Sequence, residues 1–182
     1  TEFSSQSALG GLLAAANSVA VVAIAAAPYP VLAARSVPVA VSYLAARIAE
    51  SVLLGAGVAC LLTILPVGAH LAQNAGAQNA VAFEALSFAL QTLNGWLYQF
   101  AMLALGAGSV GFCMILLRGG LIPKFLAFAG IAGYAALAAG AALELFGVKA
   151  GIILAAPGGV FELVFGVWLL WKGFGGSPSQ AN

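Results

Sequence analysis

Charged residues interrupt this chain so rarely that their scarcity constrains its fold more than any other feature. The 182 residues include six Lys or Arg and five Glu but no Asp, so that charged side chains make up 6% of the sequence. A soluble domain carries about a quarter charged residues because its surface faces water. Hydrophobic residues make up 63% of this chain. Since so few charges cannot coat a water-facing surface, the sequence indicates a protein that is embedded in a lipid bilayer.

Mostly apolar stretches of about 20 residues or more, the length that crosses a bilayer, recur five times. They predict an all-α fold, a polytopic bundle of transmembrane helices that forms one domain over residues 1–172. The spans are expected at about 9–34, 38–71, 91–117, 121–145 and 151–171. A tail over residues 173–182 is rich in Gly and Ser and is expected to be disordered.

Two stretches do not fit simple spans. The second span is longer than a bilayer requires, and its uncharged core is 51–71, so residues 38–50 are expected to extend past the membrane or to lie in its interface. Pro66 is expected to kink the far end of this helix. Residues 73–90 are expected to begin as a polar loop and to continue as a short amphipathic stretch that carries Glu84.

The few charges orient the bundle. When successive spans alternate in direction, one side collects four basic residues, Arg35, Arg118, Lys124 and Lys172. The opposite side carries Glu84, Glu144 and a single Lys149. Because loops rich in Lys and Arg stay in the cytoplasm, the N-terminus of this chain is expected outside and its C-terminus inside. An outside N-terminus before five spans leads to the hypothesis that a sixth helix precedes this chain in the full-length protein.

The fifth span contains both a helix breaker and a charge, in the stretch "AAPGGVFELVFGVWLLWKGF". Pro157 has no N–H, so the carbonyl of Ile153 loses its usual helical partner, and Gly158 and Gly159 allow the backbone to bend. Glu162 follows one turn later, about 15 Å from each interface at 1.5 Å per residue. Because discontinuous helices near a midplane charge are a transporter device, the pattern favours a hinge beside a binding or proton-handling carboxylate. The alternative is a protonated or paired structural Glu beside a proline kink.

Arg47 and Glu50 stand three residues apart in the second span and therefore share one helix face. Two arrangements fit this spacing. The pair forms an ion pair within its own helix at the membrane interface, or Arg47 also reaches Glu162 across the bundle and supplies the partner that a buried carboxylate requires.

A polar stripe runs along the third span. Gln91, Asn94 and Tyr98 follow the spacing of one helical face, and Asn17 lies at a similar depth in the first span. We expect Asn17, Asn94 and Tyr98 to line a cavity that opens to the outside and includes Glu162. The alternative is ordinary hydrogen bonding between helices, worth about 0.6 kcal/mol for each bond.

Other chemistries lack the residues they need. The net charge is +1 without a basic block, which argues against a nucleic-acid partner. Cys60, Cys113 and His70 do not cluster in the sequence, so neither a metal site nor another cofactor is expected. The sequence has no phosphate-binding loop of the form G-x-x-x-x-G-K-[ST], and a Ser-His-Asp triad is impossible without Asp.

Three stretches carry a resemblance to a known family: "RIAESVLLG" with Arg47 and Glu50, "ILLRGGLIPKFLAFAGIAGY" around residues 118–123, and "GGVFELVFGVWLLWKG" with Glu162. They are similar to a bacterial multi-pass membrane family known as domain of unknown function 4386. The resemblance extends over about residues 10–173 and implies a helix bundle in the bacterial inner membrane. Members generally carry another helix upstream, which agrees with the hypothesis of a sixth span. The family implies no activity.

Three functions fit these observations. The first is a non-enzymatic membrane module that binds or passes a small or lipid-like ligand, or a proton, at Glu162. The second is a structural or accessory subunit of a larger membrane complex, or a homo-oligomer, held through helix faces rich in small residues. The third is an intramembrane enzyme that uses Glu162 or Glu50 as acid or base with Tyr98 and His70. The sequence favours the first and gives no catalytic residue.

Overall fold

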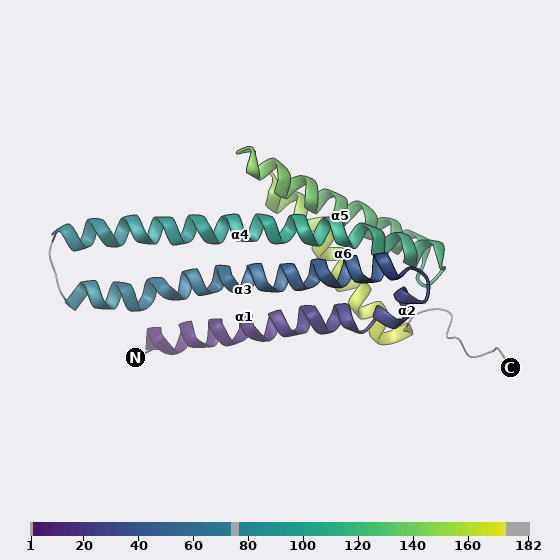
Figure 1. Ribbon diagram of the computed structural model, residues 1–182, viewed down its shortest axis with the longest axis horizontal. Coiled ribbons are helices and arrows are strands. Elements are labelled where there is room, and N and C mark those ends of the chain that lie inside the picture. The colour runs from purple at the N-terminus through teal and green to yellow at the C-terminus, as the bar shows by residue number, and fades with distance from the viewer. Residues whose placement is uncertain (1, 74–76, 174–182) are drawn as a thin grey trace.

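The computed structural model describes residues 2–73 and 77–173, and the predicted tail over 174–182 lies outside them. Six helices form within the described residues: α1 (Glu2–Ala26), α2 (Tyr29–Ala33), α3 (Val37–Gln73), α4 (Ala77–Arg118), α5 (Lys124–Leu145) and α6 (Gly151–Lys172) (Figure 1). Five stretches among them are long and apolar enough to cross a membrane. The predicted all-α bundle with about five spans is therefore confirmed.

The first predicted span is broken where two prolines stand close together. Pro28 and Pro30 have no N–H, so α1 cannot continue through them with its regular hydrogen bonds. The short α2 resumes the helical pattern, because the amide of Leu32 donates to the carbonyl of Pro28 at 3.0 Å. The sequence prediction of one uninterrupted helix over 9–34 missed this break.

Three long helices lie side by side, with α3 between α1 and α4 (Figure 1). Helix α5 packs on α4, and α6 packs on α5. Both cover the end of the α3–α4 hairpin that is nearer to α2, and they leave the opposite end uncovered (Figure 1). The hairpin end beyond α5 and α6 is called the overhang below, and it comprises residues 59–73 of α3 and 77–93 of α4.

Helix lengths explain the overhang. Helices α5 and α6 contain 22 residues each, which is about 33 Å and close to the thickness of a hydrocarbon core. Helix α3 has 37 residues and α4 has 42, or about 55 and 63 Å. Residues 38–50 pack against the other helices and include the buried Ala40, Tyr43 and Arg47, while the length of α3 beyond α5 and α6 lies at its far end (Figure 1). That residues 38–50 extend past the membrane or lie in its interface stays a prediction.

The polar loop predicted at the start of 73–90 falls partly on residues 74–76, which lie outside the described residues. The amphipathic stretch predicted to follow it with Glu84 is helical, but it is part of α4, which begins at Ala77 and runs on without interruption. Alanines and other helix-forming residues dominate this segment. Phe83 also packs against α3, because a Cβ added at Gly68 would lie 3.0 Å from the end of the Phe83 ring. This contact extends the α3–α4 pairing into the overhang.

Helix α6 passes through Pro157, Gly158 and Gly159 as one continuous helix, so the predicted discontinuous helix is wrong. Gly158 is buried where α6 crosses α5, and a Cβ added at Gly133 would lie 2.9 Å from the Gly158 Cα. The two backbones therefore nearly touch at this crossing. The glycine at 158 meets a packing requirement, and a single proline removes only one hydrogen bond from the helix.

Small residues serve the same purpose between α3 and α4. A Cβ at Gly108 would overlap the side chain of Ala46 at 2.3 Å. Close approach of this kind is how membrane helices gain packing energy without a hydrophobic driving force. It brings the C-terminal part of α4 against the part of α3 that carries Arg47.

Candidate binding site

Arg47 is the centre of a buried polar cluster. Its Nη1 donates to Glu50 Oε2 at 3.0 Å, and its Nη2 donates to Glu162 Oε1 at 2.5 Å. Arg47 and Glu50 are only 5% and 6% exposed. Of the two arrangements that the sequence left open, the second occurs, because one guanidinium holds a carboxylate on its own helix and also reaches another on α6.

The three helices place the cluster at one depth. Arg47 follows the start of α3 by ten residues, Tyr134 follows the start of α5 by ten, and Glu162 precedes the end of α6 by ten. At 1.5 Å per residue each is about 15 Å from the end that carries Lys124 and Lys172. This is half the thickness of a hydrocarbon core, so the cluster stands at the middle of α5 and α6, which are long enough to span it.

Tyr134 completes the cluster and was missed by the sequence analysis. Its hydroxyl donates to Glu162 Oε1 at 2.8 Å and accepts from Arg47 Nη2 at 3.0 Å. Its position near the middle of the fourth predicted span, level with Glu162, was the signal that could have found it. Because its hydroxyl bonds to both Arg47 and Glu162, Tyr134 sets the spacing of α5 from α3 and from α6.

Aromatic rings close one side of the cluster. The Tyr43 ring lies 5.6 Å from Arg47 Cζ, within reach of a cation–π interaction, and stacks on Phe112 with centroids 4.2 Å apart. Phe165 meets Phe112 edge to face and stacks on Phe161. These rings keep water from the guanidinium on this side, which strengthens the attraction between Arg47 and the carboxylates.

The opposite side is open and leaves polar atoms without partners. The side chain of Glu162 is 37% exposed, and both of its hydrogen bonds end on Oε1. Its Oε2 accepts no hydrogen bond from the described residues. Nε of Arg47 is buried and also has no partner among them. A buried donor without a partner costs about 1–3 kcal/mol, so a water molecule or ligand atom that accepts from Nε would be stabilised.

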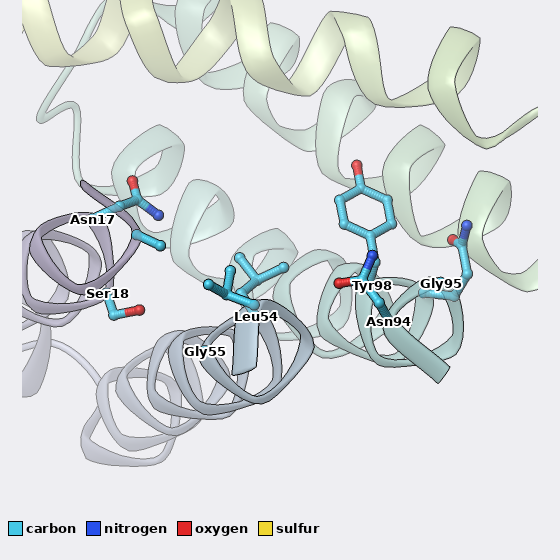
Figure 2. A pocket seen from close by; sticks show the side chains of 10 residues that line it. Asn17, Ser18, Leu54, Gly55, Asn94, Gly95 and Tyr98 are labelled. Atoms are coloured by element: carbon cyan, nitrogen blue, oxygen red, sulfur yellow. The ribbon is translucent and has the colours of Figure 1, made fainter. Parts of the chain in front are cut away.

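A separate cavity of about 440 Å³ lies between α1, α3 and α4. Figure 2 shows α3 between the two other helices, with Asn17 on one side and Asn94 and Tyr98 on the other. The full set of lining residues is Ala14, Asn17, Ser18, Leu54, Gly55, Val58, Asn94, Gly95, Tyr98 and Gln99.

The structure thus divides the predicted site into two groups. Asn17, Asn94 and Tyr98 line the cavity together, whereas Arg47, Glu50 and Glu162 form the buried cluster. Gln91, which was expected on the same stripe, instead borders an open depression in the overhang beside Phe83 and Phe88. Gln91 stands three positions before Asn94, about 4.5 Å nearer the start of α4.

The cavity and the cluster are neighbours along α3. Leu54 at the cavity follows Glu50 by four residues, one helical turn on the same face and about 6 Å. Tyr98 is close enough to Glu50 and Glu144 for their charges to act on its hydroxyl. The Tyr98 hydroxyl on the cavity wall therefore lies within electrostatic range of Glu50, a member of the cluster.

Glu144 has a structural role that the sequence did not reveal. Its Oε2 accepts from Gln99 Nε2 at 2.9 Å, and its Oε1 accepts from the amide of Gly151 at 3.0 Å. The first bond ties α4 to α5, and the second satisfies a free amide at the start of α6. Gln99 is thereby fixed at the level where α5 ends and α6 begins.

No group of three or more His, Cys or acidic residues that could hold a metal ion occurs within residues 2–73 and 77–173. Cys60 and Cys113 are both free thiols. His70 lies 20 residues beyond Glu50 on α3, about 30 Å away along the helix. The geometry therefore does not bring His70 to the acid or to Tyr98, as the enzymatic hypothesis required.

The searches of curated proteins and of solved structures found no match to this chain. The model of one family, described as a domain of unknown function (DUF4386), matches residues 1–173, which is almost the entire chain. The matched region contains all of α1 to α6, the Arg47 cluster and the cavity. It also contains the three stretches in which the sequence resembles that family. This protein, a membrane-type helix bundle, therefore belongs to the family described as a domain of unknown function (DUF4386).

Proposed function

We propose that the protein is a non-enzymatic membrane module that binds or passes a small or lipid-like ligand, or a proton, at Glu162. The observation that carries the proposal is the sharing of one buried Arg47 by two carboxylates, Glu50 and Glu162. A purely structural ion pair needs one acid for one base. Here the second acid is the more exposed one, and it lies at the midpoint of its helix.

Charge balance makes a proton the best supported ligand. With Arg47 positive and both carboxylates ionised, the cluster carries one excess negative charge. An unbalanced charge at the centre of a bilayer costs several kcal/mol, and a bound proton or small cation removes that cost. Glu162 Oε2 is the acceptor that the described residues leave free, so this oxygen is the proposed binding atom.

The packing of α6 supports a site that can exchange its ligand. Glu162 follows Gly158 by four residues, one turn from the close contact with Gly133. A small rotation about this contact changes the distance between Glu162 and Arg47 while the α5–α6 interface is kept. The predicted hinge of Pro157, Gly158 and Gly159 is retained in this form, as a pivot within a continuous helix.

Infrared spectroscopy of the full chain in lipid nanodiscs tests this proposal. The difference spectrum of wild type minus Glu162→Gln should contain a carboxylic acid band that disappears as the pH rises, because the other four Glu are common to both proteins. Glu84→Gln is the matched control, because Glu84 lies in the overhang away from the cluster. If wild type and Glu162→Gln show the same titrating band, and proton flux through liposomes is equal as well, the proposal is wrong.

A second candidate is an accessory subunit of a larger membrane complex. The overhang favours this candidate. Helices α5 and α6 do not reach it, so large apolar side chains there are exposed and available to a partner. Val81 and Phe88 are 68% and 73% exposed. Extraction from the native membrane with its lipids, followed by mass measurement, should then show a partner or a second copy. A free monomer under those conditions would leave the binding module as the better proposal.

The membrane assignment rests on the five apolar helices. The proposal adds the bacterial inner membrane, with the N-terminus of this chain outside and its C-terminus in the cytoplasm. The basic residues at the α2, α4–α5 and α6 ends support this orientation through the positive-inside rule.

A further inference from the structure

Three polar side chains in the cavity between α1, α3 and α4 have no protein partner. Asn17, Asn94 and Tyr98 all line it, and no hydrogen bond among the described residues uses their side chains. Their neighbour Gln99 donates to Glu144, so it is at least partly satisfied. The unpaired groups provide amide and hydroxyl donors and acceptors on two opposite walls.

The shape of the cavity is set by glycines. A Cβ at Gly57 would lie 2.5 Å from Asn94 Oδ1, so the Asn94 side chain is seated in the space that this glycine leaves. A Cβ at Gly95 would meet nothing within 4 Å, so space remains above the α4 wall. Leu54 and Val58 supply an apolar floor on α3. The cavity therefore offers hydrogen bonds on its walls and apolar contact beneath them.

Charge and depth restrict what this cavity can hold. Its lining residues include no charged side chain, so no ion pair is offered to a phosphate, a carboxylate or an ammonium group. Gln99, which is part of the lining, is bonded to Glu144 near the end of α5, and Glu144 is bonded to the start of α6. The cavity thus begins at the level where α5 ends and α6 begins, which is the level of lipid headgroups.

The cavity is accessible from the side. Helix α1 packs on α3, while α5 packs on α4 and α6 packs on α5, so no large interface joins α1 to α6. The cavity is only partly enclosed, and all of its lining residues belong to α1, α3 and α4. A molecule that is itself anchored in the membrane can enter through the open side, and a volume of about 440 Å³ is within the range of small-molecule sites.

We infer that this cavity binds the uncharged, hydroxyl-bearing head of an amphiphile, with Asn17, Asn94 and Tyr98 as its hydrogen-bonding partners. The glyceryl head of a monoacylglycerol has this chemistry, and so does free glycerol in the water outside. The acyl chain distinguishes the two sources, since only the amphiphile gains from the apolar floor and the lateral opening. This inference does not depend on Glu162.

Photo-crosslinking tests the inference on the full chain in phosphatidylcholine nanodiscs. The probe is a monoacylglycerol with a photoreactive group near its glyceryl head. We expect crosslinking of wild type at α1 or α4, with a drop of at least fivefold in Gly95→Leu, which fills the cavity without a steric clash. Gly166→Leu is the matched control, because a Cβ at Gly166 on α6 also meets nothing within 4 Å and lies outside the cavity.

A second variant and unlabelled competitors distinguish binding of the monoacylglycerol from binding of other ligands. Tyr98→Phe removes a single hydroxyl and should lower crosslinking by about threefold to tenfold, the effect of one hydrogen bond. It serves as the second test if Gly95→Leu does not fold. Excess unlabelled monoacylglycerol should compete, whereas excess free glycerol or phosphatidylglycerol should not. Equal crosslinking in wild type, Gly95→Leu and Tyr98→Phe would overturn the inference, and so would competition by phosphatidylglycerol as strong as that by monoacylglycerol.

The outcome for Glu162→Gln separates this inference from the proposed function. The variant should keep the monoacylglycerol crosslink and lose the titrating carboxylic acid. Loss of the crosslink in Glu162→Gln with an intact fold would show that the cavity and the cluster form one site, and would overturn their separation.

Discussion

Arg47 and Glu162 lie 115 residues apart in the sequence and meet at 2.5 Å in the middle of the bundle. The contact joins α3 to α6 at the depth where Tyr134 of α5 adds its hydroxyl. We expect Arg47→Gln to lower the free energy of unfolding by about 3–5 kcal/mol, because it leaves two carboxylates without their buried base. Unfolding in mixed micelles measures this change.

Arg35→Gln is the control for that measurement. Arg35 is exposed, and its Nη1 reaches only the carbonyl of Val31, at 3.5 Å. Its replacement should change the unfolding free energy by no more than about 0.5 kcal/mol. Equal effects of the two substitutions would show that the Arg47 cluster adds nothing to stability.

Tyr134→Phe should cost about 1 kcal/mol of unfolding free energy, because it removes one hydroxyl that both donates and accepts inside the cluster. Tyr98→Phe is matched to it in chemistry, and its hydroxyl has no protein partner among the described residues. In thermal unfolding, the midpoint temperature of Tyr134→Phe should therefore be clearly lower than that of Tyr98→Phe. The reverse order would contradict the assignment of Tyr134 to the cluster.

Adding a methyl group should have opposite effects on stability at two neighbouring glycines, Gly133 on α5 and Gly159 on α6. Gly133→Ala should destabilise the bundle by about 1–3 kcal/mol, because its Cβ would lie 2.9 Å from the Gly158 backbone. Gly159→Ala should be neutral or should stabilise by up to about 1 kcal/mol, since its Cβ meets nothing within 4 Å. Unfolding midpoints distinguish them, and a tolerated Gly133→Ala would rule out the tight crossing.

Orientation can be read from single cysteines in a chain whose Cys60 and Cys113 are replaced by Ala. A membrane-impermeant maleimide added to intact cells should label Glu84→Cys, which lies in the overhang on the predicted outer side. It should label Lys124→Cys only after the membrane is opened. Labelling in the opposite order would reverse the orientation proposed for this chain.

The sequence predicted the number of spans and the importance of Arg47 and Glu162, because both depend on local signals. Charge is rare enough in this chain that each charged residue inside an apolar run is conspicuous. Asn17, Asn94 and Tyr98 were likewise predicted to share a cavity, because their depth follows from counting residues along straight helices.

Other features depend on packing that no local pattern contains. The overhang follows from α5 and α6 covering one end of the α3–α4 hairpin (Figure 1), which no pattern within α3 or α4 indicates. Gly158 was interpreted as a break, although its real constraint is Gly133 on the neighbouring helix. The separation of the cavity from Glu162 likewise required the positions of three helices in space.

The spacing of the cluster along the chain also matters while the protein is being made. At about 5–20 residues per second, the 115 residues between Arg47 and Glu162 take about 6 to 23 s to synthesise. Throughout that interval the guanidinium must enter lipid without its partner on α6. Glu50 leaves the ribosome directly after Arg47 and bonds to it within one helical turn, so it is a counterion that travels with the arginine. Glu50 thus lowers the free-energy cost of inserting α3 into lipid before the other helices of the bundle have been made.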